Sequence, residues 1–272
     1  MRPMLFSTLI RRSFARAATG FAAVAGILAA FQLIMVLTAT IYQAANSFET
    51  LTSLVPPSLQ RAMGSSVMTL ASFQGLATFG YFHPVAVLVI VQAAAYMATE
   101  SAGEVEWGLF DLQLARPIAR HWVITRSLVL SFGLTVAATM AMVSTTWLGL
   151  VSFAPAGARW PSAWTLVNLA AHLVMLGWGF AAAGAAVAAF ARRRGSAFGT
   201  TALGVVFLYL LSVVADLWEP AAPLRWISPF HYFSGVAVVN GSASTGFDLA
   251  VLAIPVVGFS LIAYWQFGRR DL

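Results

Sequence analysis

The densest group of side chains that could bind a partner through charge lies between residues 100 and 126, in the segment ESAGEVEWGLFDLQLARPIARHWVITR. Four of the chain's nine acidic residues fall in its first half. In a helix, Glu100, Glu104 and Asp111 share one face through their spacing of four and seven residues. The segment therefore predicts a short helix with an acidic face.

The same helix has an apolar face formed by Trp107, Phe110 and Leu114, which recur at helical spacing. Pro117 disfavours helical backbone at the residue before it, so we expect the helix to end or bend there. Positive or titratable side chains follow at Arg116, Arg120 and His121. Two interpretations stay open on physical grounds: a docking site for a cytosolic protein, or a juxtamembrane helix that lies on the bilayer.

Two residue types are missing from the chain, and their absence excludes several kinds of chemistry. All 15 basic residues are arginine, and there is no cysteine. Without lysine the chain has no P-loop lysine for ATP and no lysine Schiff base. Without cysteine it has no disulfide, thiolate nucleophile or cysteine zinc site.

Enzymatic motifs are also missing from the sequence. Neither an H-E-x-x-H nor a G-x-S-x-G string is present, and no acidic pair falls inside an apolar interval. We therefore expect no catalytic residue and no metal site in this chain.

The composition indicates an integral membrane protein. Of the 272 residues, 60% are hydrophobic and only 9% charged, against about 25% charged residues in a soluble domain. A helix needs about 20 apolar residues to cross the hydrocarbon core. The intervals that satisfy this predict six spans, at about 21–42, 80–99, 127–152, 164–190, 196–215 and 249–268.

The arginines predict the orientation of these spans. With six spans, one face receives both termini, the 100–126 loop and the 191–195 loop, and it carries 12 of the 15 arginines. Cytoplasmic segments are enriched in basic residues, so both termini are expected in the cytoplasm and the protein in the cytoplasmic (inner) membrane. The net charge of +6 therefore indicates topology rather than nucleic-acid binding.

The remaining segments suggest one membrane domain over 1–272, without a separate soluble domain. The N-terminal MRPMLFSTLIRRSFAR predicts a basic amphipathic helix at the interface, or a plain topogenic tail. The uncharged interval 226–247 is rich in Gly, Ser and Asn and predicts short re-entrant or interfacial pieces. The fold class is thus all-α, with six transmembrane helices, an N-terminal interfacial helix and a cytoplasmic helix in the 100–120 loop.

Few polar side chains fall within the predicted spans. Gln32, Gln92 and His172 could line a transport pathway, or they could make hydrogen bonds between helices. No charged residue is among them, which argues against ion-coupled transport. Small residues in the fourth span and the pair Gly195 and Gly199 predict close helix packing, within the chain or at a dimer seam.

The string GEVEWGLFDLQLARPIAR resembles the signature of the type-2 ABC transporter permease family. The C-terminal FGRRDL and the segment WISPFHYF before the last span also resemble features of that family, whereas Gln113 departs from its usual leucine. The matching loop would then be the coupling helix that docks on an ATPase. On this resemblance the coupling interface comprises Glu104, Glu106, Trp107, Gly108, Phe110, Asp111, Leu114, Arg116, Pro117 and Arg120.

The resemblance implies specific partners. Such permeases pair with a second copy or a paralogue, and each pair docks two separate ATPase subunits that bind ATP and Mg. This chain would then hold no cofactor. Its partners would be the ATPase subunits, the second permease copy or paralogue and membrane lipids, and the complex would be an exporter. The alternative is a non-transporting membrane scaffold that docks a cytosolic partner through the same loop.

Overall fold

The computed structural model describes residues 3–45, 47–48, 65–108 and 121–269. Within these residues the backbone is helical or irregular and contains no strand. Six helices are long and apolar enough to cross a membrane, and they fall on the six predicted intervals. The protein is therefore an all-α, multi-pass membrane protein.

The spanning elements are longer than the intervals expected from the gaps between charges. They are α1 (Pro3–Ala44), α5 (Phe73–Phe82) with α6 (Pro84–Ala98), α9 (His121–Phe153), α10 (Ala163–Phe190), α11 (Arg194–Leu217) and α13 (Thr245–Arg269). At 1.5 Å per residue, a helix of 33 residues exceeds the ~30 Å hydrocarbon core. The sequence analysis placed Arg126 and Arg194 in connecting loops. In the structure both residues instead lie near the ends of helices.

Short helices fill the connections. They are α4 (Ser65–Leu70), α7 (Glu100–Glu106), η1 (Glu219–Ile227), η2 (Pro229–Tyr232) and α12 (Gly235–Val239). Of these, η2 and α12 lie within the uncharged interval 226–247, for which the sequence predicts short re-entrant or interfacial pieces.

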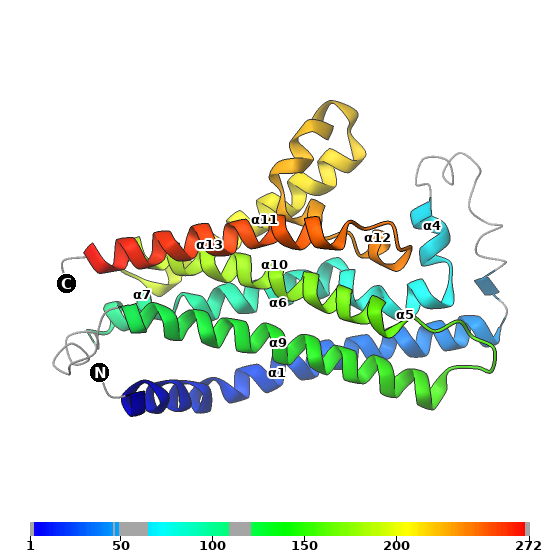
Figure 1. The fold of residues 1–272 in the computed structure, drawn as a ribbon, viewed down its shortest axis with the longest axis horizontal. Coiled ribbons are helices and arrows are strands. Elements are labelled where there is room, and N and C mark those ends of the chain that lie inside the picture. Colours follow the sequence, from blue (N-terminus) through cyan, green and yellow to red (C-terminus); the bar gives the residue numbers. More distant parts are fainter. Residues whose placement is uncertain (1–2, 46, 49–64, 109–120, 270–272) are drawn as a thin grey trace.

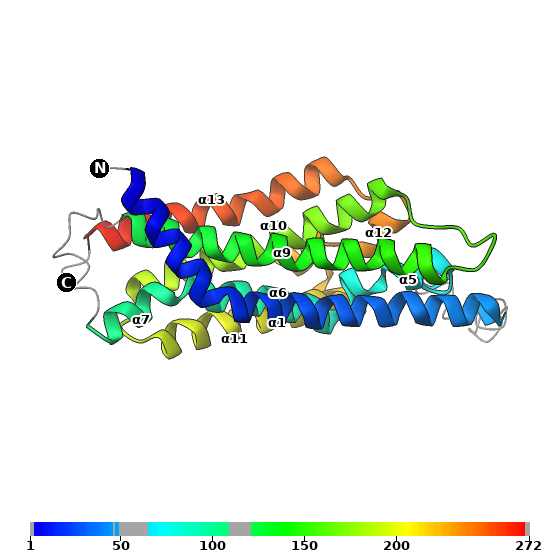
Figure 2. The same cartoon turned by 90° about the horizontal axis from the view of Figure 1, so that it is seen from below.

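The long helices lie side by side in an elongated bundle with two different ends (Figures 1 and 2). At one end lie α7, the starts of α1, α9 and α11, and the end of α13. We call this the α7 end. At the opposite end lie α4, the start of α5, α12 and the starts of α10 and α13, which we call the α12 end (Figure 1).

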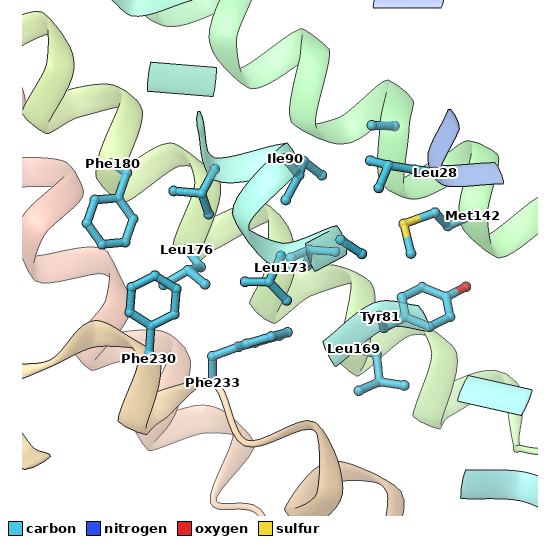
Figure 3. Packing of buried hydrophobic residues seen from close by; sticks show 14 of the residues in the cluster. Leu28, Tyr81, Ile90, Met142, Leu169, Leu173, Leu176, Phe180, Phe230 and Phe233 are labelled. Carbon is cyan, nitrogen blue, oxygen red and sulfur yellow. The ribbon is translucent and has the colours of Figure 1, made fainter. Parts of the chain in front are cut away.

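Helix α10 is the centre of the bundle. Of its most apolar stretch, 67% is buried, against 44% or less for the other five spans. It packs against α6, α9, α11 and α13. Figure 3 shows its residues Leu169, Leu173 and Leu176 among aromatic and aliphatic side chains from the surrounding helices.

Glycines of α10 allow the neighbouring helices to approach closely. A Cβ on Gly184 would lie 3.1 Å from the carbonyl oxygen of Ala95, and one on Gly177 would lie 2.7 Å from the Thr135 side chain. This confirms the packing expected for the fourth span. For Gly195 and Gly199 the prediction of packing within the chain is wrong. A Cβ added at either residue would meet no atom within 4 Å in the described part of the chain.

The second span begins earlier than predicted and is interrupted. It starts at Phe73 instead of residue 80, and α5 and α6 are separated by His83 alone. Pro84 excludes helical backbone at His83, whose ψ is 129°. The His83 Nδ1 accepts a hydrogen bond from the Val85 backbone amide and so caps the start of α6.

The N-terminal stretch is helical, as expected, and it continues into the first span as a single helix of 42 residues. Its first turns cross the bundle obliquely near α9 (Figure 2). Phe14 packs against Gly133 of α9, where its ring leaves no room for a side chain. The aromatic side chain therefore contacts protein and does not lie free in the interface.

The second half of α11 leaves the bundle and turns back through η1, as a hairpin that projects sideways (Figure 1). Large apolar side chains on it are exposed, including Leu217 at 83% and Ile227 at 63%. Exposed apolar surface is expected where a helix faces lipid, because lipid tails are themselves apolar. Four tryptophans away from the α7 end are also exposed: Trp160, Trp164, Trp218 and Trp226.

Candidate functional site at the alpha7 end

Helix α7 continues the second span across a single residue, Thr99. It contacts α6, α9, α10 and α11, so this short helix is built into the end of the bundle. Its residues Ser101, Ala102 and Gly103 are buried. Movement of α7 would therefore be passed directly to four other helices.

A buried ion pair ties α7 to the start of α9. The Arg126 side chain is 3% exposed, and its Nη2 donates to Oε1 of Glu104 over 2.7 Å. The same nitrogen lies 3.9 Å from Oε2 of Glu100, one turn earlier on α7. Removing one partner of a buried pair leaves an uncompensated charge and typically costs about 3–5 kcal/mol. Arg126 thus fixes α7 in position.

The two carboxylates do not use all of their hydrogen-bonding capacity. Glu100 Oε2, Glu104 Oε2 and Arg126 Nε are buried without a hydrogen-bond partner among the described residues. Unsatisfied buried polar atoms weaken the net stability of such a cluster. The contact is therefore strongly dependent on its geometry.

A second contact ties α7 to the start of α11. Glu106 Oε2 accepts a hydrogen bond of 2.9 Å from the backbone amide of Arg194, the first residue of α11. A carboxylate there satisfies a free amide and favours the helix dipole. The Arg194 guanidinium in turn lies 4.0 Å from the centroid of the Tyr96 ring and donates to the Tyr96 carbonyl.

Gly103 lies close to the Arg194 side chain. A Cβ on Gly103 would lie 3.2 Å from Cδ of Arg194. A side chain at this position would therefore require a small shift of the flexible arginine side chain.

Helix α7 ends earlier than the sequence suggested. Trp107 is its C-cap, and Gly108 follows with a φ of 64°. This left-handed conformation suits glycine and stops the helix. The expected continuous helix up to Arg116 is therefore wrong: it is interrupted at Gly108. Trp107 is left 70% exposed at the tip of α7.

The interface residues expected from the resemblance have three different outcomes. Glu104 and Glu106 are engaged in the internal contacts described above, and Glu104 is only 6% exposed. A buried carboxylate held by Arg126 cannot also face a docked protein, so Glu104 positions α7. Trp107 and Gly108 lie at the surface tip. The remaining residues, Phe110, Asp111, Leu114, Arg116, Pro117 and Arg120, lie outside the described part of the chain.

The polar residues inside the spans make hydrogen bonds within the bundle. Gln32 Nε2 donates to the Ala77 carbonyl over 2.7 Å, and Gln92 Nε2 donates to the Ala202 carbonyl over 3.3 Å. Both bonds join different helices, as one of the two interpretations expected. His172 Nδ1 instead bonds the Asn168 carbonyl, one turn earlier in its own helix. The structure thus spreads these three residues over separate contacts.

Sequence reasoning missed the roles of Arg126 and Arg194, which it counted only as topology signals. A usable signal was present for Arg126: two acids four residues apart precede the only arginine that borders the third predicted span. No local signal indicated Arg194, because it meets Glu106 from 88 residues away. Within the described residues, no three His, Asp or Glu side chains are grouped to hold a metal ion.

Comparison with known families adds one match. Residues 33–272 match the family described as "Protein of unknown function (DUF2705)". The match begins within the last third of α1 and includes every later element. No curated protein matches the chain.

Proposed function

We propose that this chain, a member of the DUF2705 family, is the permease subunit of an ATP-binding cassette transporter, most simply an exporter. Two copies of a separate ATPase subunit would bind ATP and Mg and dock at the α7 end. A second permease copy, or a paralogue, would complete the pathway. The proposal starts from the resemblance of the 103–120 segment to the type-2 permease signature.

One structural observation supports the proposal more than any other: α7 is tied by charge to two other spans. Glu104 connects it to α9 through Arg126, and Glu106 connects it to α11 through the Arg194 amide. A force applied to the segment after α7 would therefore reach three spans together. A coupling element requires such a rigid connection, whereas a loop that only lay on the bilayer would not.

The exposed tip supplies a contact surface. Trp107 is exposed and projects from a helix whose inner face is held by ion pairing. Aromatic side chains are enriched in protein interfaces because they bury a large area with few rotatable bonds. Under this proposal Trp107 contacts the ATPase, and Glu104 and Arg126 hold it in place.

The arginines support a cytoplasmic α7 end in the inner membrane. At that end the described arginines are Arg11, Arg12, Arg16, Arg126, Arg192, Arg193, Arg194 and Arg269. The opposite side of the molecule carries Arg159 and Arg225. This asymmetry is the one expected when the richer end stays in the cytoplasm. Both termini are then cytoplasmic.

Co-purification from native membranes tests the proposal. A tagged wild-type chain is extracted in mild detergent, its partners are identified by mass spectrometry, and the eluate is assayed for ATP hydrolysis. We expect a P-loop ATPase subunit with the wild type and a large loss of it with Trp107→Ala. Trp218→Ala is the matched control, because Trp218 is similarly exposed at 60% but lies on the projecting hairpin.

The outcome that contradicts the proposal is equally specific. If folded wild type brings down no ATPase under conditions that preserve known transporter complexes, the coupling assignment fails. Recovery of a different cytosolic protein that is lost with Trp107→Ala would then indicate a membrane scaffold.

A further inference from the structure

The α12 end contains a cavity that the transport proposal does not use. Its volume is about 280 Å³, and it lies between the first turns of α10, the start of α13 and the α12 turn. The residues that give it polar or aromatic character are Trp164, Thr165, Asn168, Asn240, Gly241 and Thr245. No charged side chain lines it within the described part of the chain.

Asn168 supplies an amide to this cavity. Only 6% of its surface is exposed, and it lines the cavity. Its backbone carbonyl accepts a bond from His172, whereas its side-chain amide has no bond to another described residue. The amide atoms are not among the buried side-chain atoms without a partner, so they are open to the cavity. The two donors and the acceptor of the amide can therefore bind water or a ligand that enters.

Asn240 is held in a defined orientation on the opposite wall. The hydroxyl of Thr69 in α4, itself buried, donates to its Oδ1. This contact joins residues 171 positions apart and leaves the Asn240 NH₂ group free to donate. The next residue, Gly241, has a φ of 72° and forms the turn after α12. Asn240 itself is exposed, and the bond from Thr69 orients its amide at the wall of the cavity.

Trp164 adds an aromatic surface at the edge of the cavity. It is 70% exposed and lies one turn before Asn168 on α10. The face of an indole ring carries negative electrostatic potential and attracts weakly positive C–H groups. An aromatic ring beside two amides and a threonine hydroxyl offers a ligand one apolar face and several hydrogen-bond partners.

The chemistry of the lining selects among ligand classes. An anionic ligand would find no arginine in the described lining and would face the negative surface of the indole ring. A cationic ligand would find no carboxylate there. An apolar ligand would leave Asn168 unpaired. A neutral ring that carries hydroxyl groups on its rim and C–H groups on its face satisfies every group in the cavity.

We propose that this cavity is a binding site for a neutral saccharide unit, stacked on Trp164 and hydrogen-bonded by Asn168, Asn240 and Thr245. Its volume lies just below the about 300–1,000 Å³ of pockets for drug-sized ligands, which suits one sugar ring. The sugar could be free in solution or the headgroup of a glycolipid, since both present the same hydroxyl groups. The proposal does not depend on the transport proposal.

The test uses the full-length protein in a detergent without a sugar headgroup, because alkyl maltosides would compete for the site. Saturation-transfer NMR is recorded with glucose, galactose, mannose and N-acetylglucosamine, and with their disaccharides, up to about 10 mM. A second arm reconstitutes the protein in nanodiscs with and without monoglucosyl diacylglycerol. We expect saturable binding of at least one probe. Signal from the first arm alone identifies a soluble saccharide, and signal from the second alone identifies a lipid headgroup.

Two variants connect the binding to the cavity. Trp164→Ala and Asn168→Leu are each expected to weaken binding at least tenfold, whereas Trp218→Ala leaves it unchanged. The melting temperature of each variant, measured without sugar, shows that the variant is folded.

Two results would overturn the assignment. One is the absence of saturable binding in both arms with folded protein. The other is binding that neither variant weakens.

Discussion

The two ends of the bundle are built from different side chains. At the α7 end, buried contacts are ionic: Arg126 is paired with Glu104 and lies near Glu100. At the α12 end they are neutral: Thr69 bonds Asn240, and Gly235 lies against the ring of Phe82. Ionic contacts depend strongly on geometry and are suited to holding or transmitting a position. Neutral amides and hydroxyls are suited to binding an uncharged ligand.

The difference follows from the composition of the connecting segments. The acidic residues of 100–106 meet arginines at the starts of α9 and α11, whereas 234–246 supplies only small, neutral or amide side chains. Because the spans that carry charges have them near their ends, the chemistry of each end is determined by a few residues there. The prediction with the largest expected effect concerns the side of the membrane that each end faces.

The chain has no cysteine, so single cysteines can report the side directly. Ser242→Cys at the α12 end should react with a membrane-impermeant maleimide in intact cells. Trp107→Cys at the α7 end should react only after the membrane is opened. Both side chains are exposed, so accessibility within the protein does not limit either reaction. Labelling of position 107 from outside would show that the α7 end faces the exterior, contrary to the prediction.

The next largest effect is expected at the buried ion pair. Arg126→Met leaves Glu104 buried without its partner and should lower the free energy of unfolding by about 3–5 kcal/mol. Arg193→Met, at an exposed position in the same end, is the matched control. The measurement is the thermal unfolding of purified protein. Equal melting temperatures for the two variants would show that the pair contributes nothing.

A double variant tests why Arg126→Met lowers the stability: because the Glu104 carboxylate is left unpaired, or because the guanidinium itself is lost. Adding Glu104→Leu to Arg126→Met removes both charges and should restore much of the stability, because the unpaired carboxylate is then absent. If the double variant is as unstable as the sum of the two single variants, the two side chains do not interact.

A packing change should have an intermediate effect at the α12 end. A Cβ on Gly235 would lie 2.3 Å from the ring of Phe82, so Gly235→Ala forces a rearrangement. We expect a loss of about 1–3 kcal/mol, typical of overpacking. Gly199→Ala is the control, since its Cβ meets no described atom within 4 Å. Thermal unfolding again gives the readout, and a stable Gly235→Ala would mean that α12 moves away without cost.

The smallest stability effect is expected for Glu106→Gln. The amide oxygen can still accept from the Arg194 backbone amide, but the negative charge at the start of α11 is lost. The change should cost about 0.3–1 kcal/mol, decreasing as salt is added. Unfolding in low and high salt measures it. A loss as large as that of Arg126→Met would show that the two contacts are equivalent, contrary to their different burial.

The six spans could be predicted from the sequence because charge is excluded from the hydrocarbon core. Their ends could not, since the helices continue past the core and carry Arg126 and Arg194 on their terminal turns. The break in the second span had a readable cause in Pro84, because a proline disfavours helical backbone at the residue before it. The stop of α7 at Gly108 was less visible, since glycine is also tolerated within helices.

The two sites were predictable to different degrees. The acidic helix of the α7 end was found from its local spacing. Its partners come from other helices, and of these Arg126 had a usable local signal whereas Arg194 had none. The cavity at the α12 end depends on Thr69 meeting Asn240 across 171 residues. Neither residue stands out in the sequence, because single Thr and Asn residues in loops are common. Tertiary packing alone brings them together.

The most direct test of the central claim, that the α7 end docks an ATPase, is crosslinking from a single cysteine in native membranes. A photoactivatable maleimide is attached at Trp107→Cys or, as the control, at Trp218→Cys on the projecting hairpin. After illumination, the crosslinked proteins are identified by mass spectrometry. The account predicts that position 107 captures a P-loop ATPase subunit and that position 218 does not. Capture of no ATPase at position 107, in membranes where the same subunit is present, would contradict it.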